Sequence, residues 1–233
     1  MTELAQNFDE QGYVVFDGVV GKEALIELEE RVAELQYALR IKDSSGKALT
    51  QAGTRNLLRK DWVRALAAYI SGDLRIAQFL PQSLICLQCN YFFKTVDVNW
   101  HVALHQDLSV PVESQFASKG WGGWSLKEGE LFVQPPKEII KELVIARLHI
   151  ENTCATNGAL EVVPGSHKAS VSSTERVLVP VEAGGVMLMR PLLMHGSRKI
   201  RSGTRNVLHF VFAPRDLNIP GQWPQGAWVK NKA

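Results

Sequence analysis

The stretch Leu84-Ile-Cys-Leu-Gln-Cys-Asn-Tyr-Phe-Phe93 decides the class of fold, because the chain changes there from a helical to a strand pattern. Its aromatic and apolar residues favour extended structure. Further downstream, short apolar runs are separated by Gly, Pro, Asn and Ser, with no alternation of strands and helices. Such a series predicts an antiparallel sandwich or barrel. The runs cover residues 143–150, 160–163, 176–181, 186–189 and 206–212.

Upstream of this stretch the pattern is helical. Five apolar residues within 22–39 recur at spacings of three and four, which predicts an amphipathic helix with one buried face. We expect two further helices at 61–70 and 73–80, with Asp61 and Asp73 as their N-caps. The five residues of the apolar stripe are Leu25, Leu28, Val32, Leu35 and Leu39.

A strand is expected at residues 12–16 and a polar loop at 41–56. Together these elements predict a mainly β fold with flanking helices: a double-stranded β-helix, or cupin-like jelly roll, with helices packed on one sheet. We interpret residues 1–233 as one domain, whose N-terminal third is helical and whose jelly-roll core begins at about residue 83.

Composition argues against several classes of partner. The chain has 233 residues and a formal net charge of +2, and its basic residues are scattered. A charge this small, without a polybasic block, gives no support to nucleic acid or a membrane as a partner, and we expect neither. The first residues lack the pattern of a secretion signal, and no apolar run is long enough to span a bilayer. We therefore expect a soluble cytoplasmic protein that acts on a small molecule, and the sequence leaves its oligomeric state open.

The three cysteines provide no disulfide framework. Cys86 and Cys89 form a Cys-x-x-Cys pair in a strand-like run, where residues i and i+3 should face opposite sides. No second pair accompanies them, so we interpret them as buried, inert thiols rather than as a redox or zinc motif.

The next motif, Trp100-His-Val-Ala-Leu-His-Gln-Asp107, places an imidazole and a carboxylate two residues apart. In a strand, His105 and Asp107 would project from one face and reach a common cation, while Gln106 serves as a spacer. A third ligand can come from His195, which ends an apolar stretch. Two histidines and one carboxylate are the ligands that hold Fe(II) in non-haem oxygenases. The alternative is that these histidines are hydrogen-bonded strand residues; the other four histidines show no comparable pattern.

Further motifs accompany this one. They are Asn157-Gly-Ala-Leu-Glu-Val-Val-Pro-Gly-Ser-His167, His195-Gly-Ser197, Arg205 before the last strand, Gly12-Tyr-Val-Val15, and the segment from Phe93-Lys94 to His105-Gln-Asp107. Together they resemble the phytanoyl-CoA dioxygenase family of Fe(II)/2-oxoglutarate-dependent oxygenases, over most of the chain. The resemblance implies the same jelly-roll fold, metal ligands at His105, Asp107 and His195, and the use of Fe(II), 2-oxoglutarate and O2.

The resemblance also implies a reaction. 2-Oxoglutarate would be decarboxylated to succinate and CO2 while an unactivated C–H bond of a small-molecule substrate is hydroxylated. Because Asp107 supplies the third ligand, hydroxylation is favoured over halogenation, in which a halide takes the place of the carboxylate. The alternatives are desaturation or cyclisation in natural-product biosynthesis, a cupin-type metalloenzyme that uses no oxoacid, and a non-catalytic jelly-roll binding protein.

The remote carboxylate of 2-oxoglutarate needs a cation inside the barrel, and arginine meets both carboxylate oxygens with its planar fork. By resemblance Arg205 takes this role, and Ser197 and Gln88 are further cosubstrate contacts. The interval from the second histidine ligand to Arg205 is about one residue shorter than is usual in the family, which leaves Arg201 as a competitor. We predict Arg205, because it should begin the last strand and face inward.

Four further residues are candidates for substrate contact. Arg147 and His149 share a strand face that by family analogy turns toward the pocket, where a cation suits an acidic substrate; the alternative is a surface pair. The segment 109–141 is long, has no regular apolar pattern, and contains Trp121 and Trp124. We predict a lid that presents these tryptophans to the substrate, although they could instead anchor the segment to the sheet.

Overall fold

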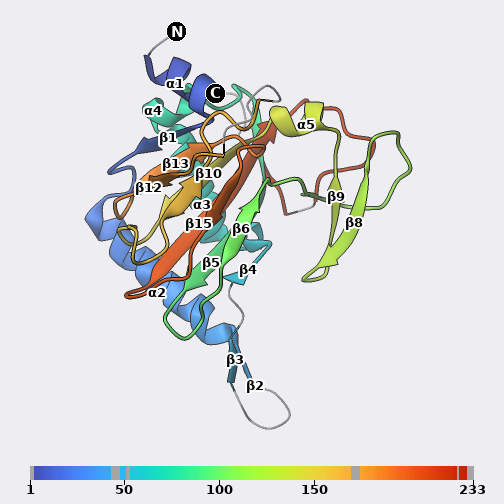
Figure 1. The fold of residues 1–233 in the computed structure, drawn as a ribbon. Coiled ribbons are helices and arrows are strands. Elements are labelled where there is room, and N and C mark those ends of the chain that lie inside the picture. The colour runs from blue at the N-terminus through green and yellow to red at the C-terminus, as the bar shows by residue number, and fades with distance from the viewer. Residues whose placement is uncertain (1–2, 43–47, 51–52, 169–173, 225, 230–233) are drawn as a thin grey trace.

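Two antiparallel sheets enclose the interior of the protein (Figure 1). The computed structural model describes residues 3–42, 48–50, 53–168, 174–224 and 226–229. The larger sheet consists of β1 (Tyr13–Phe16), β4 (Gly53–Thr54), β5 (Leu84–Lys94), β10 (Val144–His149), β13 (Val186–Met189), β15 (Arg205–Pro214) and β16 (Trp228–Val229). The smaller sheet consists of β6 (Val102–His105), β11 (Leu160–Val162), β12 (Val177–Val179) and β14 (His195–Ser197).

The strand order is that of a jelly roll and not of a meander. In the larger sheet it is β1-β13-β10-β15-β5-β16, with β4 also paired to β5, and in the smaller sheet it is β12-β11-β14-β6. Consecutive strands such as β10 and β11 therefore lie in different sheets, and every pairing between described strands is antiparallel. This architecture confirms the predicted mainly β fold with flanking helices.

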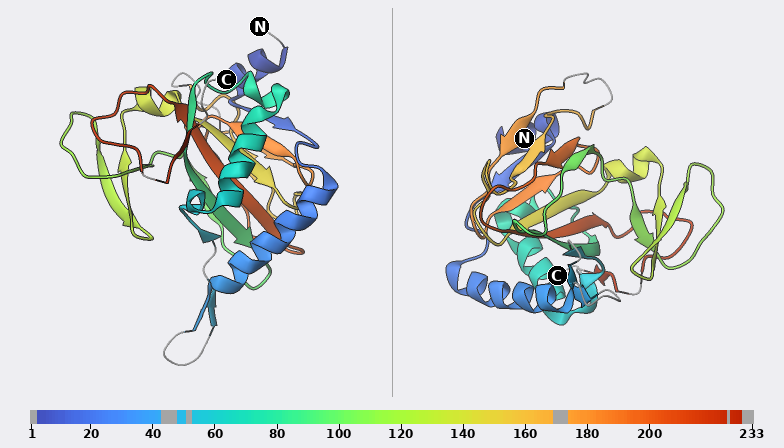
Figure 2. Two further views of the ribbon diagram at one scale, coloured as in Figure 1. Left: turned by 180° about the vertical axis from the view of Figure 1, so that it is seen from behind. Right: turned by 60° about the horizontal axis from the view of Figure 1, so that its bottom comes forward.

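Helices cover the outer face of the larger sheet (Figure 2). The long helix α2 (Lys22–Ala38) buries four of the five residues of the predicted stripe, and the fifth, Leu39, is its C-cap. The other described helices are α1 (Glu3–Gln11), the 3-10 helix η1 (Leu57–Arg59), α3 (Asp61–Gly72), α4 (Leu74–Ala77) and α5 (Lys137–Lys141). None of these described helices is both long and apolar enough to cross a membrane.

Two helix starts differ in how they are capped. Asp61 is the first residue of α3 rather than its N-cap, which is Lys60. The Asp61 carboxylate pairs instead with Arg64, one turn further along the helix. Asp73 caps α4 as predicted, since it accepts a hydrogen bond from a backbone N–H of the first turn at 2.8 Å. α4 is shorter than the predicted range 73–80.

Alternation along the strands divides the buried side chains into two cores. In β10, Ala146 and Leu148 point toward the helices, whereas Ile145 points toward the smaller sheet. The outer core, between the larger sheet and the helices, includes Phe210 of β15. The inner core lies between the two sheets and includes Val211, so alternate residues of β15 face the interior.

β5 contains a β-bulge that the sequence pattern did not reveal. Val211 of β15 pairs with Gln88, but the next residue of β15 pairs with Cys86. Leu87 is therefore an extra residue, and the alternation shifts by one position. As a result Cys86 and Cys89 both lie in the outer core, so the prediction that they face opposite sides was wrong. Both thiols are free and fully buried, and burial raises the pKa of each, in agreement with inert thiols.

The segment 109–141, predicted to be irregular, contains three strands and helix α5. The strands are β7 (Val110–Val112), β8 (Gly122–Lys127) and β9 (Glu130–Gln134), and they form a separate sheet in the order β7-β9-β8. Positive φ angles at Glu128 (51°) and Gly129 (81°) turn the chain between β8 and β9. The prediction failed because these strands have only three to six residues each, and β8 begins with two glycines, so none shows a clear apolar alternation. Figure 1 shows the β8–β9 hairpin at the edge of the molecule, below α5.

The region 41–56, predicted to be a loop, also contains strands. They are β2 (Arg40–Lys42) and β3 (Ala48–Thr50), which pair with each other, and β4. β4 pairs with β5 so closely that a Cβ at Gly53 would lie 2.1 Å from the carbonyl oxygen of Tyr91. Residues 43–47 and 51–52 of the predicted loop lie outside the described residues.

We expect Phe210→Ala to lower the free energy of unfolding by about 3–5 kcal/mol, because it removes a fully buried ring from the outer core. Tyr69→Ala on α3, where this side chain is 56% exposed, should change it by less than about 0.5 kcal/mol. Denaturant unfolding followed by circular dichroism measures both. Equal losses in the two variants would show that the outer core does not carry the stability of the fold.

Candidate metal centre

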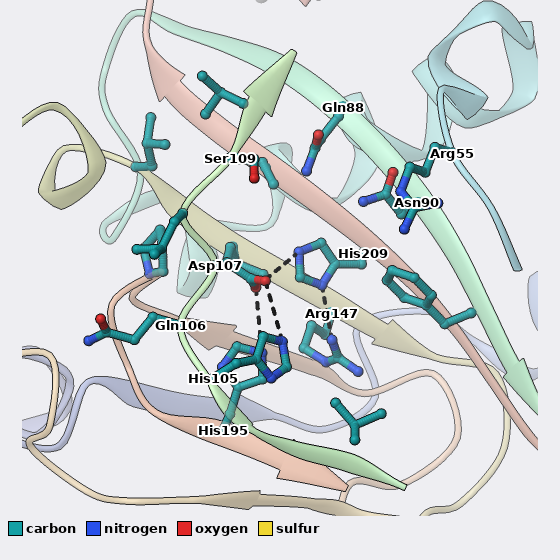
Figure 3. Close-up of a pocket in the computed structure, with 18 of the residues that line it drawn as sticks. Arg55, Gln88, Asn90, His105, Gln106, Asp107, Ser109, Arg147, His195 and His209 are labelled. Atoms are coloured by element: carbon teal, nitrogen blue, oxygen red, sulfur yellow. Dashed lines mark hydrogen bonds and ion pairs between the residues drawn. The ribbon is translucent and has the colours of Figure 1, made fainter. Parts of the chain in front are cut away.

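Three of the predicted site residues come together at the edge of the smaller sheet. His105 ends β6, His195 begins β14, and the two pair directly across the sheet. The centroids of their rings lie 4.3 Å apart. Asp107 follows the last residue of β6 by two positions. One potential ligand atom from each of the three residues lies within 4.8 Å of the others. Figure 3 shows both imidazoles directed at the Asp107 carboxylate.

Backbone hydrogen bonds fix the tautomers of the two histidines. Nδ1 of His105 donates to the carbonyl of Ala103 at 2.9 Å, and Nδ1 of His195 donates to the carbonyl of Leu193 at 2.8 Å. A carbonyl oxygen only accepts, so each Nδ1 carries the proton and each Nε2 offers a lone pair. The Nε2 atoms lie 3.7 and 3.5 Å from the Asp107 carboxylate oxygens. Histidines oriented by their other nitrogen in this way are typical metal ligands.

The segment that carries Asp107 is held against the loop before β14. The backbone N–H of Asp107 donates to the carbonyl of Pro191 at 2.9 Å, and the Gln106 amide donates to the carbonyl of Leu192 at 2.5 Å. Gln106 therefore does not compete for the cation, in keeping with its predicted role as a spacer. Asp107 Oδ2 is buried and has no hydrogen-bond partner among the described residues, which suits an oxygen that binds a metal ion.

The charge of Asp107 is stabilised by its surroundings. Burial alone would raise the pKa of its carboxyl group, but the attraction of the three histidines in their protonated form (His195, His209 and His105), together with the charge of Arg147, outweighs burial and lowers the pKa. For His195 the balance is reversed: burial lowers its pKa more than Asp107 raises it. The centre therefore presents an ionised carboxylate and neutral imidazole, the protonation states that a divalent cation requires.

His209, which the sequence pattern did not single out, supports this centre from β15. Arg147 donates from Nη1 to Nδ1 of His209 at 2.9 Å, so the remaining proton of a neutral ring lies on Nε2. That Nε2 faces Asp107 Oδ2 at 3.7 Å (Figure 3). Burial lowers the pKa of His209 to about 3. The signal that could have revealed His209 is its place on the inward face of β15, in register with Arg147.

The centre opens into a cavity of about 420 Å³. One end of the barrel interior contains Arg205, which is 4% exposed and lines this cavity, whereas Arg201 lies in an exposed loop outside it. The Arg205 guanidinium donates from Nη1 to the carbonyl of Gly158 at 2.7 Å, and its Nε has no partner among the described residues. Burial lowers the pKa of Arg205 to about 9, and the charge of Arg147 adds to this effect.

Lys94 is a second buried cation beside Arg205, and the two residues pair across β5 and β15. Its Nζ donates to Ser197 Oγ at 2.8 Å and to the carbonyl of Arg198 at 2.9 Å. Burial, followed by the charges of Arg205 and Arg147, lowers the pKa of Lys94 to about 7. No described carboxylate forms an ion pair with Lys94 or Arg205, so this end of the barrel can accept an anion.

Gln88 and Arg205 both line the cavity, but they lie at different positions along the paired strands β5 and β15. Along β15, its partner Val211 is six residues from Arg205, roughly 20 Å at the rise of a strand, and His209 lies between them. Gln88 therefore lies on the opposite side of the metal centre from Arg205 and is too far away to contact the same carboxylate. Gln88 is therefore not a partner of the remote carboxylate beside Arg205 and Ser197, and its contact with another part of the cosubstrate stays a prediction.

Of the four residues suggested for substrate contact, only Arg147 is in the described lining of the cavity. His149 faces inward as predicted but is buried behind the cavity, with Nδ1 3.4 Å from Thr153 Oγ1. Trp121 and Trp124 both pack edge-on against Phe116, with ring centroids 5.1 Å apart in each case. Phe116 belongs to the same segment, and all three rings pack against the inner core between the sheets, which agrees with the alternative that the tryptophans anchor the segment to the sheet. The segment still forms one wall of the cavity, through residues such as Ser109, Lys127 and Phe132.

Comparison with known proteins gives one family and several structural neighbours. A family model described as phytanoyl-CoA dioxygenase (PhyH) matches residues 8–207. No curated protein matches the chain by sequence. Among solved structures, the chain is similar to the non-heme alpha ketoglutarate dependent carbocyclase SnoK from nogalamycin biosynthesis. The two sequences are 18% identical, the match covers 99% of this chain and 96% of that chain, and the TM-score is 0.68.

Two further neighbours have the same fold. HygX from Streptomyces hygroscopicus, crystallised with nickel and 2-oxoglutarate, is 20% identical, with 93% of this chain and 88% of that chain covered and a TM-score of 0.63. The non-heme alpha ketoglutarate dependent epimerase SnoN from nogalamycin biosynthesis is 18% identical, with coverages of 93% and 86% and a TM-score of 0.59. At these identities the likeness concerns the fold alone.

We expect His105→Ala, Asp107→Ala and His195→Ala each to weaken divalent metal binding by at least about a hundredfold while the fold is retained, because each removes one of three ligands. His101→Ala, at an exposed position in the same segment, is the matched control and should bind metal like the parent. Calorimetric titration with Ni(II) measures the affinity, and circular dichroism checks the fold. Parental affinity in any of the three variants would remove that residue from the ligand set.

Proposed function

Because the chain belongs to the phytanoyl-CoA dioxygenase family of Fe(II)/2-oxoglutarate-dependent oxygenases, we propose that it hydroxylates an unactivated C–H bond of a small-molecule substrate. The overall reaction consumes the substrate, O2 and 2-oxoglutarate and yields the hydroxylated product, succinate and CO2. The observation that carries the proposal is the cluster of two histidines and one carboxylate beside a buried arginine without an acidic partner.

In this proposal His105, Asp107 and His195 hold Fe(II). Their atoms fit the ion because both Nε2 atoms are unprotonated and Asp107 Oδ2 is buried and makes no hydrogen bond with a described residue. When bound, Fe(II) and 2-oxoglutarate together supply the activation of O2 and the oxidising power for the C–H bond. Three protein ligands leave the other face of the ion open to the oxoacid and O2.

Arg205, Ser197 and Lys94 would hold the remote carboxylate of 2-oxoglutarate. Arg205 offers a planar fork with an unpaired Nε, and Lys94 and Ser197 are already hydrogen-bonded to one another beside it. A dianion at this position would supply the negative charge that the two buried cations lack. HygX, with the same fold, has been crystallised with 2-oxoglutarate.

Arg147 and His209 would act through Asp107 rather than on the substrate. Arg147 fixes the ring of His209, whose Nε2–H is directed at Asp107 Oδ2. This contact orients the carboxylate for the metal ion, as outer-shell partners of metal ligands commonly do. The strands β7 and β9 contribute Val110 and Phe132 to the wall of the cavity, where apolar side chains exclude water from the reacting C–H bond.

A second candidate reaction is desaturation or cyclisation in natural-product biosynthesis. SnoK, a carbocyclase, and SnoN, an epimerase, both have this fold. The same metal centre can lead to these outcomes, since abstraction of hydrogen from the substrate is common to all of them. Mass spectrometry of the product distinguishes them: hydroxylation adds one oxygen atom, desaturation or cyclisation removes two hydrogen atoms, and epimerisation leaves the mass unchanged.

The decisive experiment is the formation of succinate from 2-oxoglutarate by the Fe(II)-loaded protein under air and under nitrogen. We expect succinate only with O2 and only with His105, Asp107 and His195 intact. A protein that binds Fe(II) but forms no succinate with any candidate substrate would be a non-catalytic binding protein. Product formation without 2-oxoglutarate would indicate a metalloenzyme that does not use the oxoacid.

Arg205→Ala should raise the apparent dissociation constant of 2-oxoglutarate by on the order of a hundredfold, because it removes a desolvated, charge-assisted pair. Arg201→Ala is the matched control, and it should change the constant little because this residue lies in an exposed loop. Both variants should bind Ni(II) normally. Calorimetric titration of the Ni(II)-loaded proteins with 2-oxoglutarate measures the effect, and the reverse ranking would make Arg201 the binding residue.

The affinity for 2-oxoglutarate should fall as the pH rises above about 7. Burial lowers the pKa of Lys94 to about 7 in the ligand-free protein, so above this pH the amine is neutral. A bound carboxylate favours the ammonium form, so binding takes up a proton, and affinity should fall by up to about tenfold per pH unit. Titrations between about pH 6 and pH 9 measure this. Lys94→Met should bind more weakly at pH 6 and lose this dependence; an identical slope in both proteins would contradict the assignment.

A further inference from the structure

The cavity has another cationic residue in its wall, on the side of the metal centre away from Arg205. Lys127 ends β8, is half-buried, and lines the cavity together with Gln88 and Ser109. Its Nζ donates to Ser109 Oγ at 3.3 Å. Figure 3 shows Ser109 beside Gln88, on one side of the Asp107–His209 pair. Since Gln88 lies far from Arg205 along the paired strands, Lys127 belongs to the opposite end of the cavity.

The described contacts of Lys127 are with neutral groups. Besides the Ser109 hydroxyl, its Nζ lies 4.7 Å from the centre of the Phe132 ring. No described carboxylate lies within ion-pair distance of it. Burial lowers its pKa, the charge of Arg55 adds to this effect, and Asp107 opposes it. Asp107 is the charge that a bound metal ion would neutralise, so Lys127 would then lack any compensating anion.

The acidic residues next to Lys127 are occupied elsewhere. Glu128 accepts hydrogen bonds from Thr54 Oγ1 at 2.7 Å and from the backbone and side chain of Arg55 at 2.8 and 3.0 Å. Glu130 pairs with Arg59 at 2.9 Å. These contacts tie the tip of the β8–β9 hairpin to the segment from β4 to η1, and they hold Lys127 at the cavity wall. They also leave its positive charge unpaired.

Two amides that line the cavity have unused acceptors: Gln88 lies at the Lys127 end, and Asn90 lies next along the strand face, opposite His209. Gln88 Oε1 and Asn90 Oδ1 are buried and have no hydrogen-bond partner among the described residues. Both side chains face the cavity from β5 (Figure 3). Buried acceptors of this kind are costly unless a ligand donates to them. Phe92 and Phe132 add apolar surface to the lining, which also includes Arg55, a cation that is paired with Glu128.

We propose that Lys127 binds an anionic group of the prime substrate, a carboxylate or a phosphate or sulfate monoester. Gln88 and Asn90 then accept hydrogen bonds from hydroxyl or amine groups of the same molecule. The substrate is accordingly a small acid with an apolar portion and hydrogen-bond donors. This inference rests on the proposed function, because it takes the Arg205 end of the cavity to be filled by 2-oxoglutarate.

The test uses three small probes and the protein loaded with Ni(II) and 2-oxoglutarate, so that no turnover occurs. The probes are 3-phenylpropionate, phenyl phosphate and the neutral 3-phenylpropionamide. The proteins are the parent, Lys127→Gln, the charge-retaining Lys127→Arg, and Lys119→Gln, which alters an exposed lysine of the same segment as a matched control. Ligand-observed NMR measures the dissociation constants, and the two anionic probes separate a carboxylate site from a phosphate site.

We expect the parent and Lys119→Gln to bind at least one anionic probe about tenfold more tightly than the amide. Lys127→Gln should lose this preference and Lys127→Arg should retain most of it. A parent protein without any preference for anions, or a preference that survives in Lys127→Gln, would overturn the proposal. A hundredfold loss of 2-oxoglutarate affinity in Lys127→Gln would also overturn it, because Lys127 would then bind the cosubstrate. The probe measurements do not depend on succinate formation, so failure of the proposed function is detected separately.

Discussion

The metal centre depends on the register between β6 and β14. Direct pairing of His105 with His195 brings two residues that are far apart in the sequence within contact distance. The carbonyls of Ala103 and Leu193 then fix the protons on Nδ1, so both Nε2 atoms face Asp107. A slip of one residue would turn an imidazole to the other face of the sheet. The register of this short strand pair therefore determines whether the protein has a metal site at all.

The interior around this centre carries an excess of positive charge. Asp107 is the acidic residue among the described residues that line the cavity, while Arg147, Arg205 and Lys127 all face it. Burial lowers the pKa of Arg147 to about 10 and that of Arg205 to about 9, which reflects the free energy needed to desolvate these cations. A dianionic cosubstrate at one end and an acidic substrate at the other would offset this cost. Bound ligands should therefore stabilise the folded state as well as the reacting groups.

The two ends of the cavity are built from different kinds of structure. Arg205 and Lys94 lie on β15 and β5, two long paired strands at the centre of the larger sheet. Lys127 lies on a hairpin that is held at its tip by ion pairs with Arg55 and Arg59. A rigid sheet suits a cosubstrate that a whole family shares, whereas a peripheral hairpin can vary with the substrate.

The order of residues alone predicts the jelly roll, the leucine stripe of α2, the family, and the pairing of Asp107 with two histidines as candidate ligands. These features depend on local periodicity and short motifs, which the order of residues expresses directly. The sequence favoured Arg205 over Arg201 without settling the choice. That Arg205 faces the interior, that β5 has a bulge before Gln88, and that His209 and Lys127 line the cavity becomes visible only when the strands are paired. The hairpin within 109–141 was also missed, because its short strands have too little apolar alternation to be recognised. One physical reason explains these differences between prediction and structure. The side chains that meet inside a barrel are set by the register between strands that are distant in sequence. A single inserted residue changes that register without altering the local pattern.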